Sequence, residues 1–131
     1  MILDTSFLRD LKDQDQAALA HARHIESLGV PLRIPSIVSF EWYYGVQYVP
    51  NPVQDQRSFQ RLSANKTFQE LTDPIARKAG TLNAEHEQSD TKPDLGTRDS
   101  IIAATGLQLD EPVVTTDSDF ERIDNLQVSM P

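Results

Sequence analysis

Short apolar segments alternate with longer helical patterns along the 131 residues, and no other feature limits the possible folds as narrowly. Apolar runs without a helical period indicate strands, whereas apolar residues spaced three and four apart indicate amphipathic helices. Strands that alternate with helices favour a parallel sheet covered on both faces. We therefore expect an α/β fold with three layers, α/β/α, around a central and mostly parallel sheet.

The predicted strands are residues 1–4, 31–35, 67–71, 112–115 and 126–128. The predicted helices are residues 15–29, 36–48, 53–64, 73–87 and 97–107, with a turn or short helix at 5–12 and a short helix near 120–123. Gly29 is expected to end its helix and Ser36 to cap the next one. Leu28 is expected to face inward and His86 to face solvent.

The size and composition are those of one domain, residues 1–131, with 38% hydrophobic residues to form its core. No run reaches the roughly 18 apolar residues of a membrane helix. The first residues, Met-Ile-Leu-Asp, lack the basic and apolar regions of a signal peptide. The absence of cysteine excludes disulfides and thiolate-bound zinc. We expect a cytoplasmic protein without a membrane association.

The formal net charge is −8, from 12 basic and 20 acidic residues. This balance is unusual for a protein that binds nucleic acid, since phosphate contacts usually dominate that affinity. An acidic surface can serve solubility alone. The four lysines against eight arginines and the many aspartates also resemble proteins from high-salt organisms, and both interpretations stay open.

Four acidic residues stand in short apolar or small-residue segments: Asp4 in MILDTSFL, Glu41 in VSFEWYYG, Asp99 in GTRDSIIAAT and Asp117 in VVTTDSDF. Asp4 and Asp117 follow predicted strands, and parallel sheets bind ligands beyond such strand ends. Four like charges at one place cannot all stay ionised without a cation. Oxygen ligands and the lack of cysteine indicate Mg²⁺ or Mn²⁺, and such sites often serve phosphoryl transfer.

Three of these acids also have an ordinary structural explanation. Asp4 is a suitable N-cap for the segment after it. Asp99 places favourable negative charge at a helix start. Glu41 would fit the exposed face of an amphipathic helix, although its spacing from Ile37 puts it near the core side.

The segments MILDTSFL, GTRDSIIAAT and VVTTDSDF resemble, in this order, the opening strand and turn, the third acidic motif and the closing motif of PIN domains. The similarity runs from residue 2 to about residue 128 and is strongest to VapC-type toxins of type II toxin–antitoxin pairs. It implies a Mg²⁺- or Mn²⁺-dependent endoribonuclease in which Asp4, Glu41, Asp99 and Asp117 hold one or two ions. Thr116 departs from the pattern, because many relatives carry Arg or Asn there.

Five further residues are candidates for weaker roles at this site. Ser6 either binds a ligand or caps the backbone, Thr115 either contacts substrate or packs, and Asp119 either supports the ligands or caps the following helix. Arg9 and Arg98 are each close in sequence to a site acid, and are either phosphate binders or ordinary ion pairs.

The resemblance also implies partners: an RNA substrate, and a small VapB-like antitoxin whose tail places an Arg among the carboxylates. The helix at 36–48 contains more aromatic residues than one helix face can bury: Phe40, Trp42, Tyr43, Tyr44 and Tyr48. The surplus is expected to form a homodimer or antitoxin surface, unless two or three of the rings simply pack in the core.

Two other functions compete with the ribonuclease. A catalytically silent PIN-like module would bind RNA or protein only, but it would have no need of four acids. A metal-dependent phosphatase on a similar sheet would carry an Asp-x-Asp pair after its first strand, whereas Asp4 is followed by Thr5 and Ser6.

Overall fold

The computed structural model describes residues 1–131 and contains a five-stranded sheet in the order β3-β2-β1-β4-β5. The strands are β1 (Ile2–Leu3), β2 (Arg33–Pro35), β3 (Thr67–Gln69), β4 (Val113–Val114) and β5 (Val128–Ser129). All four neighbouring pairs are parallel. The predicted α/β fold is confirmed, with a sheet that is entirely rather than mostly parallel.

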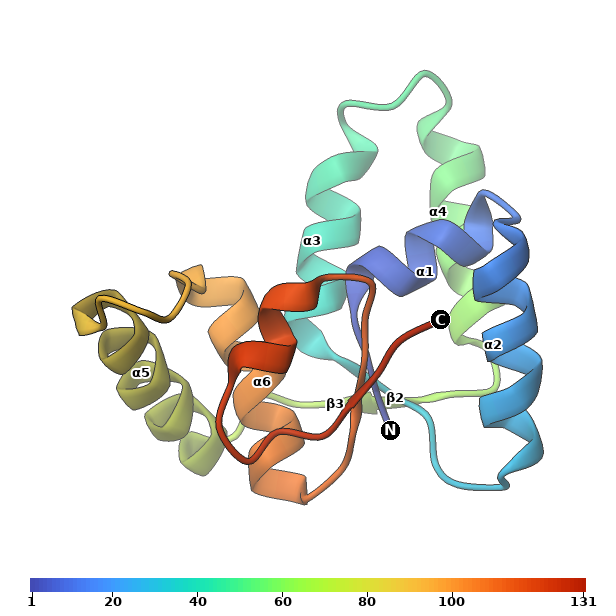
Figure 1. Cartoon of the computed structure of the whole chain (residues 1–131). Coiled ribbons are helices and arrows are strands. Elements are labelled where there is room, and N and C mark those ends of the chain that lie inside the picture. Colours follow the sequence, from blue (N-terminus) through green and yellow to red (C-terminus); the bar gives the residue numbers. More distant parts are fainter.

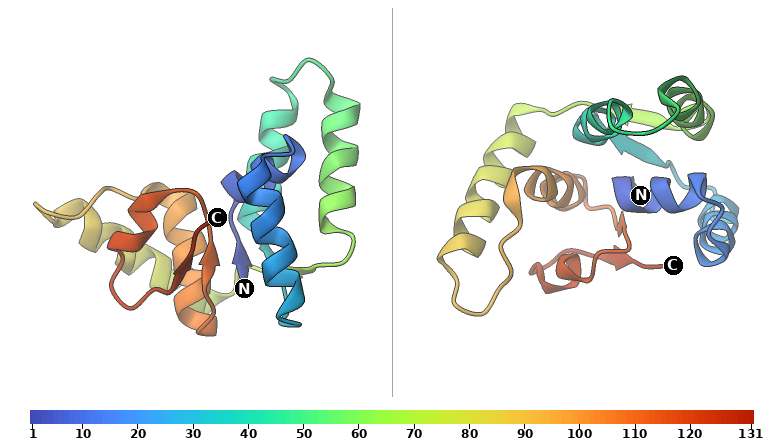
Figure 2. Two further views of the ribbon diagram at one scale, coloured as in Figure 1. Left: turned by 45° about the vertical axis from the view of Figure 1, so that its right-hand side comes forward. Right: turned by 90° about the horizontal axis from the view of Figure 1, so that it is seen from above.

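The helices are α1 (Thr5–Lys12), α2 (Gln16–Ser27), α3 (Ser36–Val46), α4 (Pro52–Ser63), α5 (Asp73–Gln88) and α6 (Gly96–Leu109), followed by the 3-10 helix η1 (Ser118–Arg122). α1, α2 and α4 lie on one side of the sheet, and α5 and α6 lie on the other (Figures 1 and 2). α3 rises from the carboxyl end of β2 and packs against α1, α4 and α6. This arrangement confirms the predicted layers.

The strands have only two or three residues each, and the burial of their apolar side chains stabilises the sheet. Ile2, Leu3, Ile34, Val113 and Val114 are fully buried between the two helical layers. Covering such a side chain from water contributes about 1.5–3 kcal/mol. Continuous apolar strands of this kind are typical of parallel sheets with both faces covered.

Several predicted boundaries are wrong in detail. Ser36 is the first residue of α3 rather than its cap, because β2 runs directly into the helix and Pro35 takes the cap position. The Ser36 hydroxyl instead donates to the Gln69 carbonyl of β3. α3 ends at Val46, two residues before the predicted end. The edge strands also shift, since β3 ends at Gln69 and β5 begins at Val128.

The end of α2 shows a further difference. Gly29 adopts a left-handed backbone, φ 67°, directly after the helix, as the predicted helix end requires. Leu28, however, is 49% exposed, because it caps the helix where the chain turns away from the core. None of the helices is both long and apolar enough to cross a membrane.

Candidate active site

Four acidic side chains, which we call the acid cluster, lie at the carboxyl end of the sheet: Asp4, Glu41, Asp99 and Asp117. Asp4 directly follows β1, and Asp117 lies three residues after the end of the neighbouring β4. Glu41 lies in the middle of α3, and Asp99 in the first turn of α6. The parallel topology thus brings together acids that are up to 113 residues apart in the sequence, since position 117 minus position 4 is 113.

Asp4 is the most enclosed member of the acid cluster, with 5% of its surface exposed. One carboxylate oxygen accepts the backbone N–H of Thr5 at 2.7 Å, so Asp4 does cap α1. The other oxygen accepts the hydroxyls of Ser6 at 3.0 Å and Thr115 at 2.6 Å. Burial still raises the pKa of Asp4 above its ordinary value, because these bonds offset only part of the cost of burying charge.

Glu41 is half-buried and is tied to Asp4 through Thr5. The Thr5 hydroxyl donates to Glu41 Oε1 at 3.1 Å, while the other Glu41 oxygen lies 3.8 Å from Nη1 of Arg98. Burial, followed by the charge of Asp4, raises the pKa of Glu41. Thr5 is absent from the predicted site, and its only sequence signal is its place next to Asp4.

Asp99 shows the strongest effect of its neighbours. Its pKa is raised to about 7, first by burial and then by the charges of Asp4, Asp117 and Glu41. The Arg98 guanidinium opposes this increase but is too exposed to cancel it. The acid cluster therefore carries more negative charge than Arg98 offsets.

Asp117 and its neighbours connect the ends of β4 and β1. The Asp117 backbone N–H donates to the Thr115 hydroxyl at 3.0 Å, and the Thr116 N–H donates to the Ser6 hydroxyl at 3.3 Å. Asp117 Oδ1 accepts the N–H of Asp119 at 2.9 Å and so caps η1. Of the two aspartates it is thus Asp117 that caps, while Asp119 is exposed within η1.

The acid cluster fits a hard divalent cation by its chemistry, because it offers carboxylate and hydroxyl oxygens and more negative charge than Arg98 offsets. No three His, Asp or Glu side chains are arranged so that they could hold one ion as they stand. Both oxygens of Asp4, and one oxygen each of Glu41 and Asp117, accept the hydrogen bonds described above. The oxygen ligands that such an ion needs are present, and hydrogen bonds within the fold hold three of the four carboxylates.

Arg9 lies apart from this hydrogen-bond network. Its Nη1 donates to both carboxylate oxygens of Asp55, at 2.8 and 3.1 Å. Its guanidinium carbon lies 3.7 Å from the ring centroid of Trp42. Arg9 is thus engaged within the fold, whereas Arg98 is half-exposed beside Glu41.

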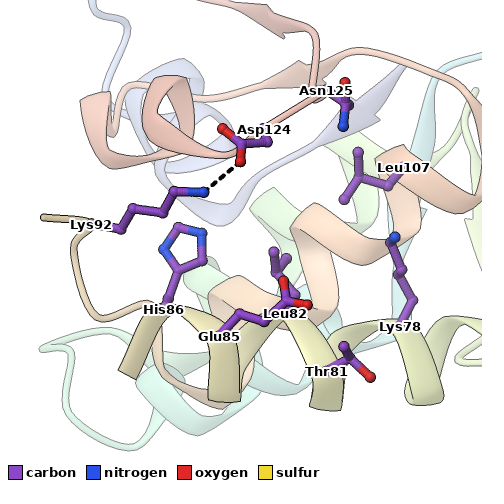
Figure 3. Close-up of a pocket in the computed structure, with 9 residues that line it drawn as sticks. All are labelled: Lys78, Thr81, Leu82, Glu85, His86, Lys92, Leu107, Asp124 and Asn125. Atoms are coloured by element: carbon purple, nitrogen blue, oxygen red, sulfur yellow. Dashed lines mark hydrogen bonds and ion pairs between the residues drawn. The ribbon is translucent and has the colours of Figure 1, made fainter. Parts of the chain in front are cut away.

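A separate pocket of about 190 Å³ lies between α5, α6 and the segment after η1, and none of the four acids lines it (Figure 3). His86 lines this pocket and is buried, so its predicted exposure is wrong. Its Nδ1 lies 2.8 Å from the Pro93 carbonyl, because the loop after α5 folds back over the helix end. Lys92 pairs with Asp124 across the pocket at 2.5 Å.

Comparison with known proteins adds a family. The sequence model of the PIN domain matches residues 1–126. The VapBC2 complex of Rickettsia felis, bound to a DNA fragment from its promoter, is similar with a TM-score of 0.87 and 21% identity over 99% of this chain and 97% of that one. DNA-bound VapBC of Salmonella typhimurium is similar with a TM-score of 0.82 and 23% identity over 98% of this chain and 96% of that one.

A third similar structure is VapC20 of Mycobacterium tuberculosis, a sarcin–ricin loop cleaving toxin, with a TM-score of 0.68 and 16% identity over 92% of each chain. At such identities the likeness concerns the fold. No curated protein matches the chain. The match to the PIN sequence model covers nearly every residue and agrees with the parallel sheet and the acids at its carboxyl end, so this chain belongs to the PIN domain family.

Proposed function

We propose that this chain, acting as a single domain, is a metal-dependent endoribonuclease and the VapC-type toxin of a type II toxin–antitoxin pair. The observation that carries the proposal is the convergence of four acids at one place, where burial and then the charges of the other three acids raise the pKa of Asp99 to about 7. A cluster of carboxylates of this kind is stabilised by a bound cation. Membership in the PIN domain family and the likeness to an RNA-cleaving toxin support RNA as the substrate.

In this proposal Asp4, Glu41, Asp99 and Asp117 hold one or two Mg²⁺ or Mn²⁺ ions. The ion supplies activation of water and neutralisation of charge at the phosphodiester. The hydroxyls of Thr5, Ser6 and Thr115 hold the carboxylates of Asp4 and Glu41 in position. Asp119 has at most a supporting role, since its contribution to the hydrogen bonds here is its backbone N–H.

Arg98 is the phosphate-binding residue in this proposal. Its side chain is 53% exposed and lies 3.8 Å from Glu41, so it reaches both solvent and the acid cluster. A guanidinium in this place pairs well with a phosphate in two parallel hydrogen bonds. Arg9 is excluded from the RNA-binding set because Asp55 and Trp42 occupy its guanidinium.

An aromatic surface on α3 and the residues just after it supports a protein partner. It consists of Phe40, Tyr43, Tyr44 and Tyr48, whose exposed fractions are 58%, 40%, 57% and 75%, while Trp42 alone of the predicted set is fully buried. The rings of Phe40 and Tyr44 stack with their centroids 6.2 Å apart, and the ring of Tyr48 lies tilted against Tyr44 at 5.4 Å. We propose that this surface binds a VapB-like antitoxin or a second copy of the chain, as the VapBC assemblies suggest.

The test is cleavage of labelled single-stranded RNA by the metal-free protein after Mn²⁺ or Mg²⁺ is added. Asp99→Asn is expected to lower the rate by on the order of 100-fold or more, since even residues that only support metal ligands matter up to about that much. Asp94→Asn is the matched control, because this substitution removes the same charge at an exposed position before α6. Cleavage that persists in EDTA, or in Asp99→Asn, would contradict the mechanism.

The competing function is a silent binding module. It predicts that the protein binds RNA or an antitoxin but cleaves nothing under any divalent ion. The same assay separates the two, provided that RNA binding is measured alongside cleavage.

A further inference from the structure

One buried acid outside the acid cluster has no place in the proposed chemistry. Asp55 of α4 is 1% exposed and is paired with two cations of α1. Arg9 donates to both of its oxygens, and Nζ of Lys12 lies 2.8 Å from Oδ1. These ion pairs link α4 to α1, because separating the two helices would leave a buried charge without a partner.

Of the two cations, only Arg9 also contacts a third helix, α3. Its guanidinium lies over the ring of Trp42, with its carbon 3.7 Å from the ring centroid, and its Nη2 donates to the Trp42 carbonyl at 3.4 Å. Trp42 in turn donates its indole N–H to the backbone carbonyl of Asp55 at 3.0 Å. Lys12 pairs with Asp55, but none of its ion pairs reaches α3.

Gly45 makes room for this arrangement on α3. A Cβ atom at position 45 would lie 3.1 Å from Nη2 of Arg9, which is closer than ordinary packing allows. The guanidinium therefore lies directly against the backbone of α3. This close approach leaves little freedom for α3 to slide or rotate relative to α1.

We propose that Arg9, Trp42 and Asp55, which we call the clamp, are positioning residues that hold Glu41 at its place opposite Asp4. Arg9 belongs to the helix that Asp4 caps, and Trp42 is the residue after Glu41. Thr5 joins the two acids directly, and the clamp fixes the same two helices further along α1. The inference rests on the proposed function, because it assigns the clamp to the metal site.

The two cations on Asp55 provide a matched pair of variants. Arg9→Met and Lys12→Met each remove one ion pair from the same buried acid, so both are expected to lower the melting temperature. Only Arg9→Met also removes the contacts of the guanidinium with Trp42 of α3. We expect it to weaken Mn²⁺ binding by on the order of 10-fold to 100-fold, as loss of support for a metal ligand does, whereas Lys12→Met changes that affinity less than about twofold.

Mn²⁺ affinity is measured by electron paramagnetic resonance on the metal-free protein without RNA. This readout separates positioning from a phosphate contact of Arg9, since lost phosphate binding would raise KM for RNA and leave Mn²⁺ affinity unchanged. Lowered kcat together with weaker Mn²⁺ binding supports the clamp. Arg9→Lys keeps the charge but not the planar stacking group, so an intermediate Mn²⁺ affinity is expected.

If Arg9→Met does not fold, Gly45→Ala perturbs the same contact from α3 and takes its place. Equal Mn²⁺ affinities for Arg9→Met, Lys12→Met and the unchanged protein would overturn the clamp. A protein that binds Mn²⁺ but cleaves no RNA would overturn the ribonuclease instead, and the comparison of Mn²⁺ affinities would still test the clamp.

Discussion

Single carboxylates in this protein have opposite effects on stability, depending on what surrounds them. Asp99 lies among like charges, and its pKa is raised to about 7 by burial and by Asp4, Asp117 and Glu41. Asp55 is more deeply buried, and burial alone would raise its pKa, but hydrogen bonds from Lys12 and Arg9 outweigh that effect and lower it. Cations within reach, rather than burial, decide which acid supports the fold.

Asp99→Asn is expected to stabilise the metal-free protein at pH 8, because it removes one of the like charges. Since Asp99 is only half-buried and solvent screens it, the gain is on the order of 1 kcal/mol. Thermal denaturation in EDTA measures it, with Asp94→Asn as the control. Added Mn²⁺ should reverse the order, because the unchanged protein then gains binding free energy. A metal-free Asp99→Asn protein that melts earlier would contradict this account.

Asp55 predicts how stability depends on acid. A carboxylate whose pKa is lower in the folded state stabilises the fold above the unfolded pKa, about 3.9, and loses this contribution as the pH falls through the folded value. Asp55→Asn should therefore cost about 2 kcal/mol at neutral pH, and the difference should shrink below about pH 4. Urea denaturation of both proteins from pH 3 to 7 measures this. A difference that stays constant over that range would rule the ion pairs out as its source.

At the scale of helices and strands, local patterns predicted the elements and topology placed them. The strand–helix alternation was sufficient for the parallel sheet, and the acid after the first strand was sufficient to locate one edge of the site. The prediction of Ser36 as a cap was wrong because α3 follows β2 without a loop, and no local pattern in the sequence indicates this. His86 failed because a loop six or more residues later covers it.

The contacts between helices were beyond the reach of the sequence. Arg9 and Asp55 are separated by 46 residues, and both have the appearance of surface charges in an amphipathic pattern. Thr5 was missed because a threonine after a capping aspartate is common in any helix start. The four acids were found because each stands in an apolar segment, whereas the groups that hold them carry no comparable signal.

The aromatic surface on α3 and the residues just after it gives a prediction about assembly. Replacing both Tyr44 and Tyr48 with Ser should leave stability within about 0.5 kcal/mol, since these side chains are exposed. The same change should abolish the dimer or the antitoxin complex, measured by light scattering coupled to size exclusion. Exposed Leu28, on the distant α2, provides a control as Leu28→Ser. Unaltered assembly in the double variant would show that the partner binds elsewhere.

At the scale of the whole molecule, the net charge of −8 opposes both compaction and RNA binding. Added salt screens repulsion between exposed charges, with a Debye length that falls from about 10 Å at 0.1 M to about 3 Å at 1 M. The melting temperature should therefore rise with KCl. Arginine contacts to phosphate weaken over the same range, whereas ions held by carboxylates are less affected.

The measurement is a KCl titration at fixed Mn²⁺ that follows melting temperature and RNA cleavage together. Cleavage is expected to depend more steeply on Mn²⁺ than on KCl. Sucrose at equal osmolality is the control, because it screens no charge. A protein that is most stable and most active at the lowest salt would refute the idea of an adaptation to high salt.

The hydrogen bond between Thr115 and Asp4 joins positions that are 111 residues apart. Asp4 is synthesised 111 residues before Thr115, and β1 can pair with its neighbour β4 only after that. A nascent chain therefore lacks a complete acid cluster until β4 and the segment with Asp117 have been made and β4 has paired with β1.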